Sequence, residues 1–74
     1  MFIDKAYARR DRLADAELER LLAALKDEAD RYRYAIQNYP PDRMERYGKP
    51  YLNRLEERVD ETQRLMSERA KHST

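Results

Sequence analysis

The chain has 74 residues, including 16 Lys or Arg, 15 Asp or Glu, a single Gly and no Cys, which allows one small domain and excludes a disulfide scaffold. The charges nearly cancel, to +1, which argues against a polyanionic DNA mimic and against a histone-like polycation. Ala, Glu, Lys, Leu and Arg account for 41 residues, a composition typical of long amphipathic helices, so we expect an all-α protein rather than a β-sandwich or a Rossmann fold.

The first element in chain order is an N-terminal arm, residues 1–13, for which the pattern allows two structures. In one, Asp4 is the N-cap of a helix that continues unbroken into the next element. In the other, a short helix ends in a kink near residues 13–15, where Leu13 and Leu18 have the spacing of a hydrophobic staple around the start of a new helix. Both remain open from the sequence.

A first long helix is predicted over residues 14–38. Leu18, Leu25 and Tyr32 recur every seven residues, and further apolar residues widen this stripe into a broad face that must be covered. Pro40 has no backbone N–H and disfavours the α conformation in the residue before it, so this helix is expected to end near residue 38.

A bend is predicted over residues 39–49, followed by a second helix over 50–71. Pro41 suits the start of a short helical turn, and Gly48 suits a left-handed position that closes this turn. In the second helix, apolar residues and one Thr recur at steps of three and four, which indicates a narrow seam. These residues are Leu52, Leu55, Val59, Thr62 and Met66.

Two helices joined by a short bend form an antiparallel helical hairpin. Because the first helix has apolar area to spare, we expect two hairpins to pair as a homodimeric four-helix bundle, with Phe2, Ile3 and Tyr7 of the arm crossing onto the partner. Glu28 falls in the apolar register, where it either fixes the register or reaches solvent or Arg58. The contacts expected within the hairpin are Tyr51 beside Ile36, Leu55 beside Tyr32, Val59 beside Ala29, and Met66 beside Leu21.

Catalytic chemistry finds no support in the sequence. There is no Cys, the lone histidine is His72 near the end of the chain, and no nucleophile, base and orienting group can be assembled. The Glu-x-x-His pattern of di-iron bundles is absent, and one Gly cannot build a phosphate loop. We therefore expect no enzyme, no catalytic residues, no metal site and no cofactor. The acidic cluster Glu56, Glu57, Asp60 and Glu61 fits a solvated helix face.

The longest uninterrupted apolar run, residues 21–25, is too short for an export signal or a membrane span. The arm carries charged residues throughout. We therefore expect a cytoplasmic protein that makes no membrane contact.

Charge is distributed in bands along the chain, and the band around the bend is basic. Residues 31–54 contain six cations against Asp42 and Glu45, a net charge of +4, and five tyrosines lie among them. Arg beside Tyr is typical of protein-interface hot spots, of surfaces that grip nucleic acid, and also of aromatic packing covered by Arg stems. The candidate binding residues, called here the basic bend patch, are Arg31, Arg33, Tyr34, Arg43, Arg46, Tyr47, Lys49 and Arg54.

The function favoured by this pattern is a protein-interaction module, such as an adaptor, inhibitor or accessory regulator, with a partner of acidic surface. A nucleic-acid-binding regulator of Rop-like architecture is the first alternative, by analogy of architecture alone. A structural coiled-coil component of a larger assembly is the second.

Overall fold

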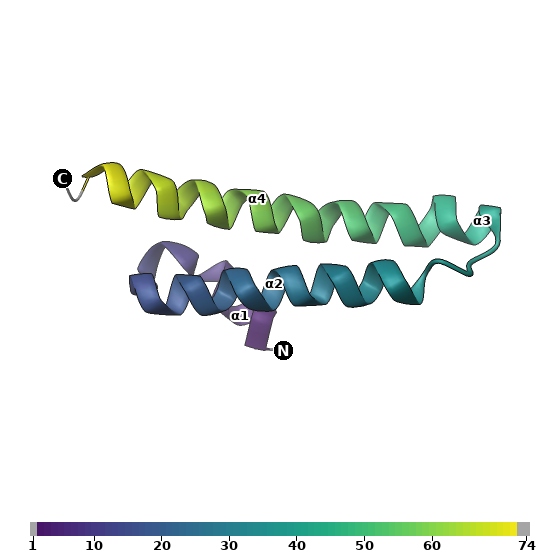
Figure 1. The fold of residues 1–74 in the computed structure, drawn as a ribbon, viewed down its shortest axis with the longest axis horizontal. Helices are drawn as coiled ribbons and strands as arrows, with labels where there is room; N and C mark the ends of the chain where they lie inside the picture. The colour runs from purple at the N-terminus through teal and green to yellow at the C-terminus, as the bar shows by residue number, and fades with distance from the viewer. Residues whose placement is uncertain (1, 73–74) are drawn as a thin grey trace.

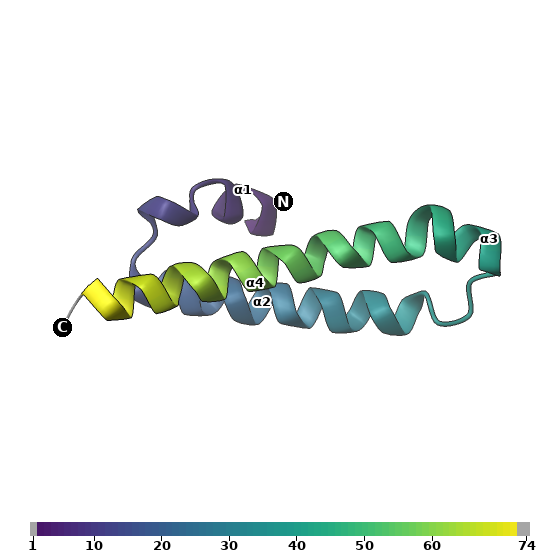
Figure 2. The same cartoon turned by 90° about the horizontal axis from the view of Figure 1, so that it is seen from above.

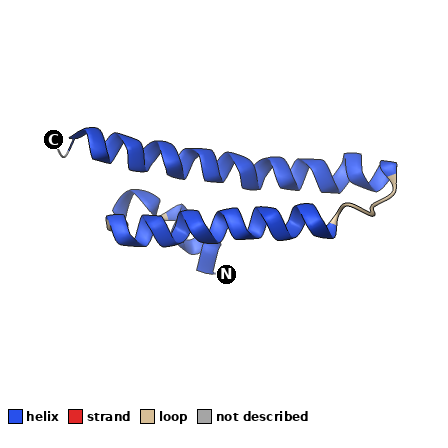
Figure 3. Ribbon diagram, viewed as in Figure 1, coloured by secondary structure: helices blue, strands red, loops and turns tan. Residues whose placement is uncertain are grey.

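The computed structural model describes residues 2–72 and the side chains from Ile3 onward. Within this range the chain is all-α, as predicted, and contains no strand (Figure 3). The two long helices, α2 and α4, lie antiparallel side by side as a hairpin whose longest dimension is 49 Å (Figure 1). In chain order the elements are α1 (Phe2–Ala8), the 3-10 turn η1 (Arg10–Arg12), α2 (Asp15–Ala35), α3 (Pro41–Arg43), the wide π-type turn η2 (Met44–Gly48) and α4 (Lys49–His72).

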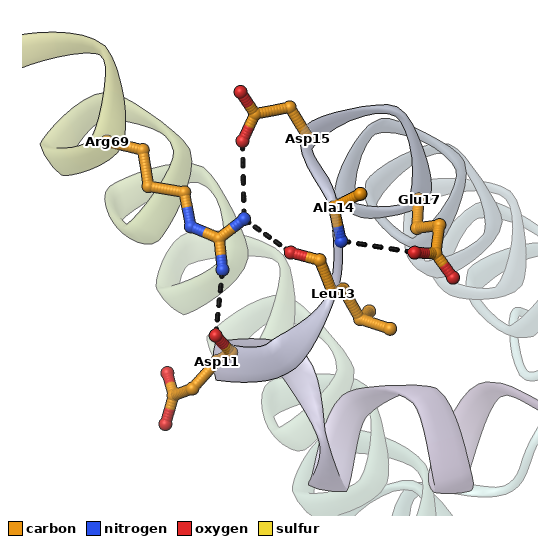
Figure 4. Close-up of polar contacts among 6 residues, drawn as sticks. All are labelled: Asp11, Leu13, Ala14, Asp15, Glu17 and Arg69. Carbon is orange, nitrogen blue, oxygen red and sulfur yellow. Dashed lines mark hydrogen bonds and ion pairs between the residues drawn. The ribbon is translucent and has the colours of Figure 1, made fainter. Parts of the chain in front are cut away.

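The arm is a short helix followed by a kink, so a continuous helix through residues 4–15 does not form. Leu13 and Ala14 are extended, with ψ of 145° and 160°. Ala14 has no side-chain acceptor to cap α2, but its own N–H donates to the Glu17 carboxylate at 3.1 Å, which satisfies this one backbone donor (Figure 4). Leu13 packs against the core cluster that contains Leu18, as the staple spacing predicts.

Because of the kink, α1 folds back along the hairpin of the same chain (Figure 2). Ala6 joins Leu18, Leu21 and Leu25 in the buried core, and Ile3 and Tyr7 pack against that cluster. The spare apolar face of the first long helix is therefore covered by its own arm, and Ile3 and Tyr7 do not depend on a second copy for a neighbour. The side chain of Phe2, expected to cross onto a partner, lies outside the described residues.

A short helical turn begins at Pro41 and continues through η2 into α4, which begins at Lys49, one residue before the predicted start at residue 50. The left-handed role expected for Gly48 is wrong, because its φ is not positive. A Cβ at Gly48 would lie 2.7 Å from Met44 Sδ and 3.3 Å from Ile36 Cδ1. Gly48 therefore leaves room for the Met44 and Ile36 side chains to lie close to the helix, and it serves no left-handed turn.

The wide turn η2 lies directly before Pro50. In it the N–H of Lys49 donates to the carbonyl of Met44, five residues earlier. Pro50 has no N–H, and its ring crowds the carbonyl four residues before it, so a local widening lets the helix pass through this proline. The proline thus re-shapes the helix where the sequence pattern indicated a fresh start.

The bend half of the hairpin has two layers only, and its core is small. Ile36 and Leu55 are buried there, and the Tyr32 and Tyr51 rings pack at 4.6 Å between centroids, inclined by 50°. Tyr51 therefore meets Tyr32, one helical turn before the expected Ile36. Glu28 is half-buried.

In the other half of the hairpin, Val59, Leu65 and Met66 pack against the cluster around Leu21, in the predicted antiparallel direction. Buried Thr62 donates its hydroxyl to the Arg58 carbonyl at 2.8 Å, so it carries no unsatisfied polar group. None of the helices between residues 2 and 72 has the length and apolar character that crossing a bilayer requires.

Candidate functional site

Four cations of the basic bend patch form ion pairs with nearby carboxylates, all on exposed side chains. Such pairs contribute little to stability, but they lower the charge available to a partner. The pairs are Arg31 with Asp27 at 2.9 Å, Arg33 with Asp30 at 2.8 Å and with Glu56 at 3.6 Å, Arg46 with Asp42 at 3.3 Å, and Lys49 with Glu45 at 2.5 Å.

The other two arginines of the patch are placed differently. The Arg43 guanidinium lies 4.6 Å from the centroid of the Tyr39 ring, a cation–π contact that covers the bend. Arg54 is exposed and has no ion pair within the part of the chain that the structure describes. Arg54 therefore offers a full charge to an external anion.

Exposed aromatic rings are concentrated at the bend half. Tyr34 is 75% exposed, Tyr47 is 64% exposed and Tyr51 is 41% exposed. The Tyr47 backbone carbonyl accepts a hydrogen bond from the Tyr32 hydroxyl at 3.3 Å, which ties the wide turn to α2. Burial, together with the neighbouring Tyr39 and Tyr51, raises the pKa of Tyr32. The Tyr32 ring is thus part of the packing at the bend half, whereas the rings of Tyr34 and Tyr47 are mostly exposed.

Part of the basic bend patch converges on one hollow beside the bend. Arg46, Tyr47 and Arg54 line it, and the residues between them on α4 and opposite them on α2 complete it, namely Pro50, Tyr51 and Tyr32. Among the described residues, none that lines this hollow carries a carboxylate. Tyr34 and Arg31 are not among its lining residues, and Arg33 lies in a different groove.

A second hollow continues the first along α4. It shares Tyr51 and Arg54 with the first and adds Leu55, Arg58 and Asp4. We call the two together the α4 groove. Tyr51 and Arg58 were not in the predicted patch, although positions 47, 51, 54 and 58 follow the steps of a single helix face. That spacing was the signal that could have found them.

The far end of the α4 groove is closed by contacts with α1. Arg58 donates to the Asp4 carboxylate at 2.8 Å, and this hydrogen bond lowers the pKa of Asp4. Guanidinium carbons of Arg10 and Arg58 lie 4.3 and 4.7 Å from the centroid of the Tyr7 ring. Arg58 therefore belongs both to the groove and to the contact that seats α1.

The Tyr7 hydroxyl donates to the Glu61 carboxylate, which also faces Arg10 at 3.5 Å. Burial and this hydrogen bond to a carboxylate raise the pKa of Tyr7. The cluster joins α1 to α4 through one aromatic ring and two opposite charges, so it acts as an anchor for the arm.

A third hollow, here called the back groove, lies between α2 and α4, with buried Ala29 and half-buried Val59 beside charged side chains of both signs. The charged residues are Lys26, Asp30, Arg33, Glu56 and Asp60. Among residues 2–72, no three His, Cys, Asp or Glu side chains are grouped closely enough to hold a metal ion.

Comparisons with protein-family models, curated proteins and solved structures found no match to this chain.

Proposed function

We propose that this protein is a non-enzymatic interaction module, an adaptor, inhibitor or accessory regulator in the cytoplasm, that binds an acidic protein surface through its bend half. The observation that carries the proposal is the hollow beside the bend. There, the exposed rings of Tyr47 and Tyr51 lie next to Arg46 and Arg54, with no carboxylate among the lining residues.

This combination suits a protein partner on physical grounds. A Tyr ring buries a large area with few rotatable bonds to immobilise, and a guanidinium can hold a carboxylate through two parallel hydrogen bonds. Both residue types are enriched at the centres of protein interfaces. The local ion pairs of Arg46 and Lys49 with Asp42 and Glu45 are exposed, so a partner's carboxylates can compete for these cations at low cost.

The test is affinity capture from an extract of the producing organism, with the full chain as bait. Reversing the charge of Arg43 and Arg46 to Glu should abolish capture of an acidic partner while helicity measured by circular dichroism is retained. The matched control reverses Arg20 and Arg64, exposed cations outside the basic bend patch, and should leave capture intact. Retention of the partner by the bend variant would overturn the proposal.

Nucleic-acid binding by the same surface is the competing outcome. It would appear as a mobility shift whose affinity falls steeply with salt, because bound cations displace counterions from phosphates. A structural coiled-coil role would instead give an isolated chain that aggregates or melts without cooperativity.

For assembly, we propose that two hairpins pair through their back grooves into a four-helix bundle. The support is self-complementarity: Lys26 and Arg33 share this groove with Asp30, Glu56 and Asp60, so a two-fold axis can set each cation against a partner's carboxylate. Sedimentation equilibrium should give a dimer for the wild-type chain and a monomer for Lys26→Glu. A monomer at all concentrations would contradict the pairing.

A further inference from the structure

We propose that the α4 groove binds an acidic amphipathic helix of a partner protein, which lies in line with α1 and extends the layer that α1 begins. This inference rests on the proposed function and adds the chemical character of the partner and the place where it binds.

The two ends of the molecule differ in the number of helical layers. At the end remote from the bend, α1 forms a third layer over α2 and α4, whereas the bend half has no such cover (Figure 2). The α4 groove begins beside the first turn of α1, at Asp4, and continues toward the bend past Leu55, Tyr51 and Tyr47. A helix seated there would complete a three-helix arrangement along the whole hairpin.

The contacts of α1 show which kinds of side chain this face of α4 binds. Ile3, Ala6 and Tyr7 turn toward the core, while Asp4 places a carboxylate 2.8 Å from Arg58 on α4. Apolar contact toward the hairpin combined with a carboxylate toward an arginine is therefore a pairing that the fold already uses.

The α4 groove also contains cations and apolar surface that an incoming helix can contact. Arg54 has no ion pair among the described residues. Arg46 lies eight residues before it, about 12 Å along the axis of a regular helix, and its exposed ion pair with Asp42 can be replaced by a partner's carboxylate. Two carboxylates about two turns apart on an incoming helix match these cations. Leu55 and the Tyr47 and Tyr51 rings give its apolar side a surface to cover.

The same details disfavour nucleic acid. The Tyr51 ring already packs on Tyr32, so that side of the ring cannot stack on a base. Asp42 and Asp4 lie against Arg46 and Arg58, where they would repel phosphates. A partner helix with two carboxylates brings less negative charge close to Asp42 and Asp4 than a strand with one phosphate per nucleotide, so it meets less repulsion.

The experiment presents a displayed library of helical peptides to the full chain. Each peptide has Leu and Ala on one face and Glu, Gln or Lys at random on the other. Selection should enrich Glu at two positions seven or eight residues apart. A peptide from the selection should perturb the backbone amide signals of Tyr47, Tyr51 and Arg54, and Arg54→Glu should weaken its binding at least about tenfold. The matched control Arg64→Glu, on the same helix but outside the groove, should bind as wild type.

Enrichment of Lys, no enrichment, binding indifferent to Arg54→Glu, or a higher affinity for a single-stranded oligonucleotide would each overturn the inference. So would sedimentation data in which a second copy occupies the groove, seen as dimerisation lost in Arg54→Glu. The proposed function fails separately. If the groove experiment fails while Arg43→Glu with Arg46→Glu still abolishes capture, only the helix-binding inference is lost.

Discussion

The guanidinium of Arg69, in the last turns of α4, donates a hydrogen bond to the backbone carbonyl of Leu13, 56 positions earlier in the chain (Figure 4). It also donates to the carbonyl of Asp11 at 2.9 Å and faces the Asp15 carboxylate at 3.2 Å. The carbonyls of Leu13 and Asp11 lie in the link between α1 and α2, where no regular helix can satisfy them. One side chain thus fixes the path of the link.

We predict that Arg69→Ala lowers the free energy of unfolding by about 1–3 kcal/mol, because two backbone carbonyls lose a charged donor. Arg69→Lys should recover only part of the loss, since an ammonium lacks the fork that reaches both carbonyls. Urea unfolding, monitored by circular dichroism, measures the change in the free energy of unfolding for both variants. The control Arg64→Ala, at an exposed position of the same helix, should change the value by less than about 0.5 kcal/mol; an equal loss in both variants would refute the role of Arg69.

Acid should release α1. The Arg58 hydrogen bond lowers the pKa of Asp4 below its ordinary value of 3.8. A carboxyl with a lowered pKa stabilises the fold above its unfolded-state pKa, and this contribution is lost as the pH falls through the folded-state pKa. Amide exchange in α1 should therefore accelerate below pH 3.8, ahead of α2. In Asp4→Asn this acid step should be absent, and its persistence would assign it to another group.

High pH should also weaken the contact of the N-terminal arm with α4, through Tyr7. Burial and the hydrogen bond to Glu61 raise the pKa of Tyr7 above its ordinary value of 10.0. A raised pKa means a contribution that is present below pH 10 and lost as the pH rises through the folded-state pKa, when two anions would face each other. Because the pKa of Tyr32 is raised as well, absorbance titration should show two late-titrating tyrosines in the wild-type chain and one in Tyr7→Phe. Identical titration curves would contradict this assignment.

The core prediction concerns Leu25, whose side chain is fully buried. Leu25→Ala should destabilise the protein by about 2–5 kcal/mol, a large share of the stability of so small a domain. Leu52→Ala, the same change at a half-buried site on α4, should cost about 1 kcal/mol. Thermal unfolding compares the two, and equal losses would mean that the core is not centred on Leu25.

The wide turn η2 gives a prediction about backbone shape. Pro50→Ala restores a backbone donor four residues after Arg46, so we expect the turn to tighten into regular α-helix. NMR should then show a hydrogen bond from residue 50 to the Arg46 carbonyl and loss of the contact between the Tyr32 hydroxyl and the Tyr47 carbonyl. A turn that stays wide in the variant would show that Gly48, not Pro50, sets its geometry.

Several features of the fold could be predicted because they depend on local chemistry. Pro40 disfavours helix in the residue before it, and α2 ends at Ala35, ahead of this proline. Apolar spacing indicated which faces of the two long helices meet. The fold-back of α1 could not be predicted, since Asp4 and Tyr7 acquire their roles from Arg58 and Glu61, 54 positions away. A continuous helix satisfies the same local pattern.

For the candidate site, the sequence indicated the bend end of the molecule but not which of its side chains line a common hollow. Arg31 and Arg33 belong to the band of positive charge, yet they pair with Asp27 and Asp30 on their own helix. Tyr51 has the spacing of a core residue but remains 41% exposed, because no third helix covers it. Which faces stay uncovered is a tertiary property, and it decides which charges and rings are available.

Arg58 contacts Asp4 and the Tyr7 ring on α1 and also lines the α4 groove. Any anionic ligand of the groove that draws Arg58 away from Asp4 must loosen α1. By thermodynamic reciprocity, the seated α1 then weakens that ligand by the same factor. Docking of the N-terminal helix and binding of such a ligand in the groove are therefore linked through one shared cation, and a change in one equilibrium shifts the other.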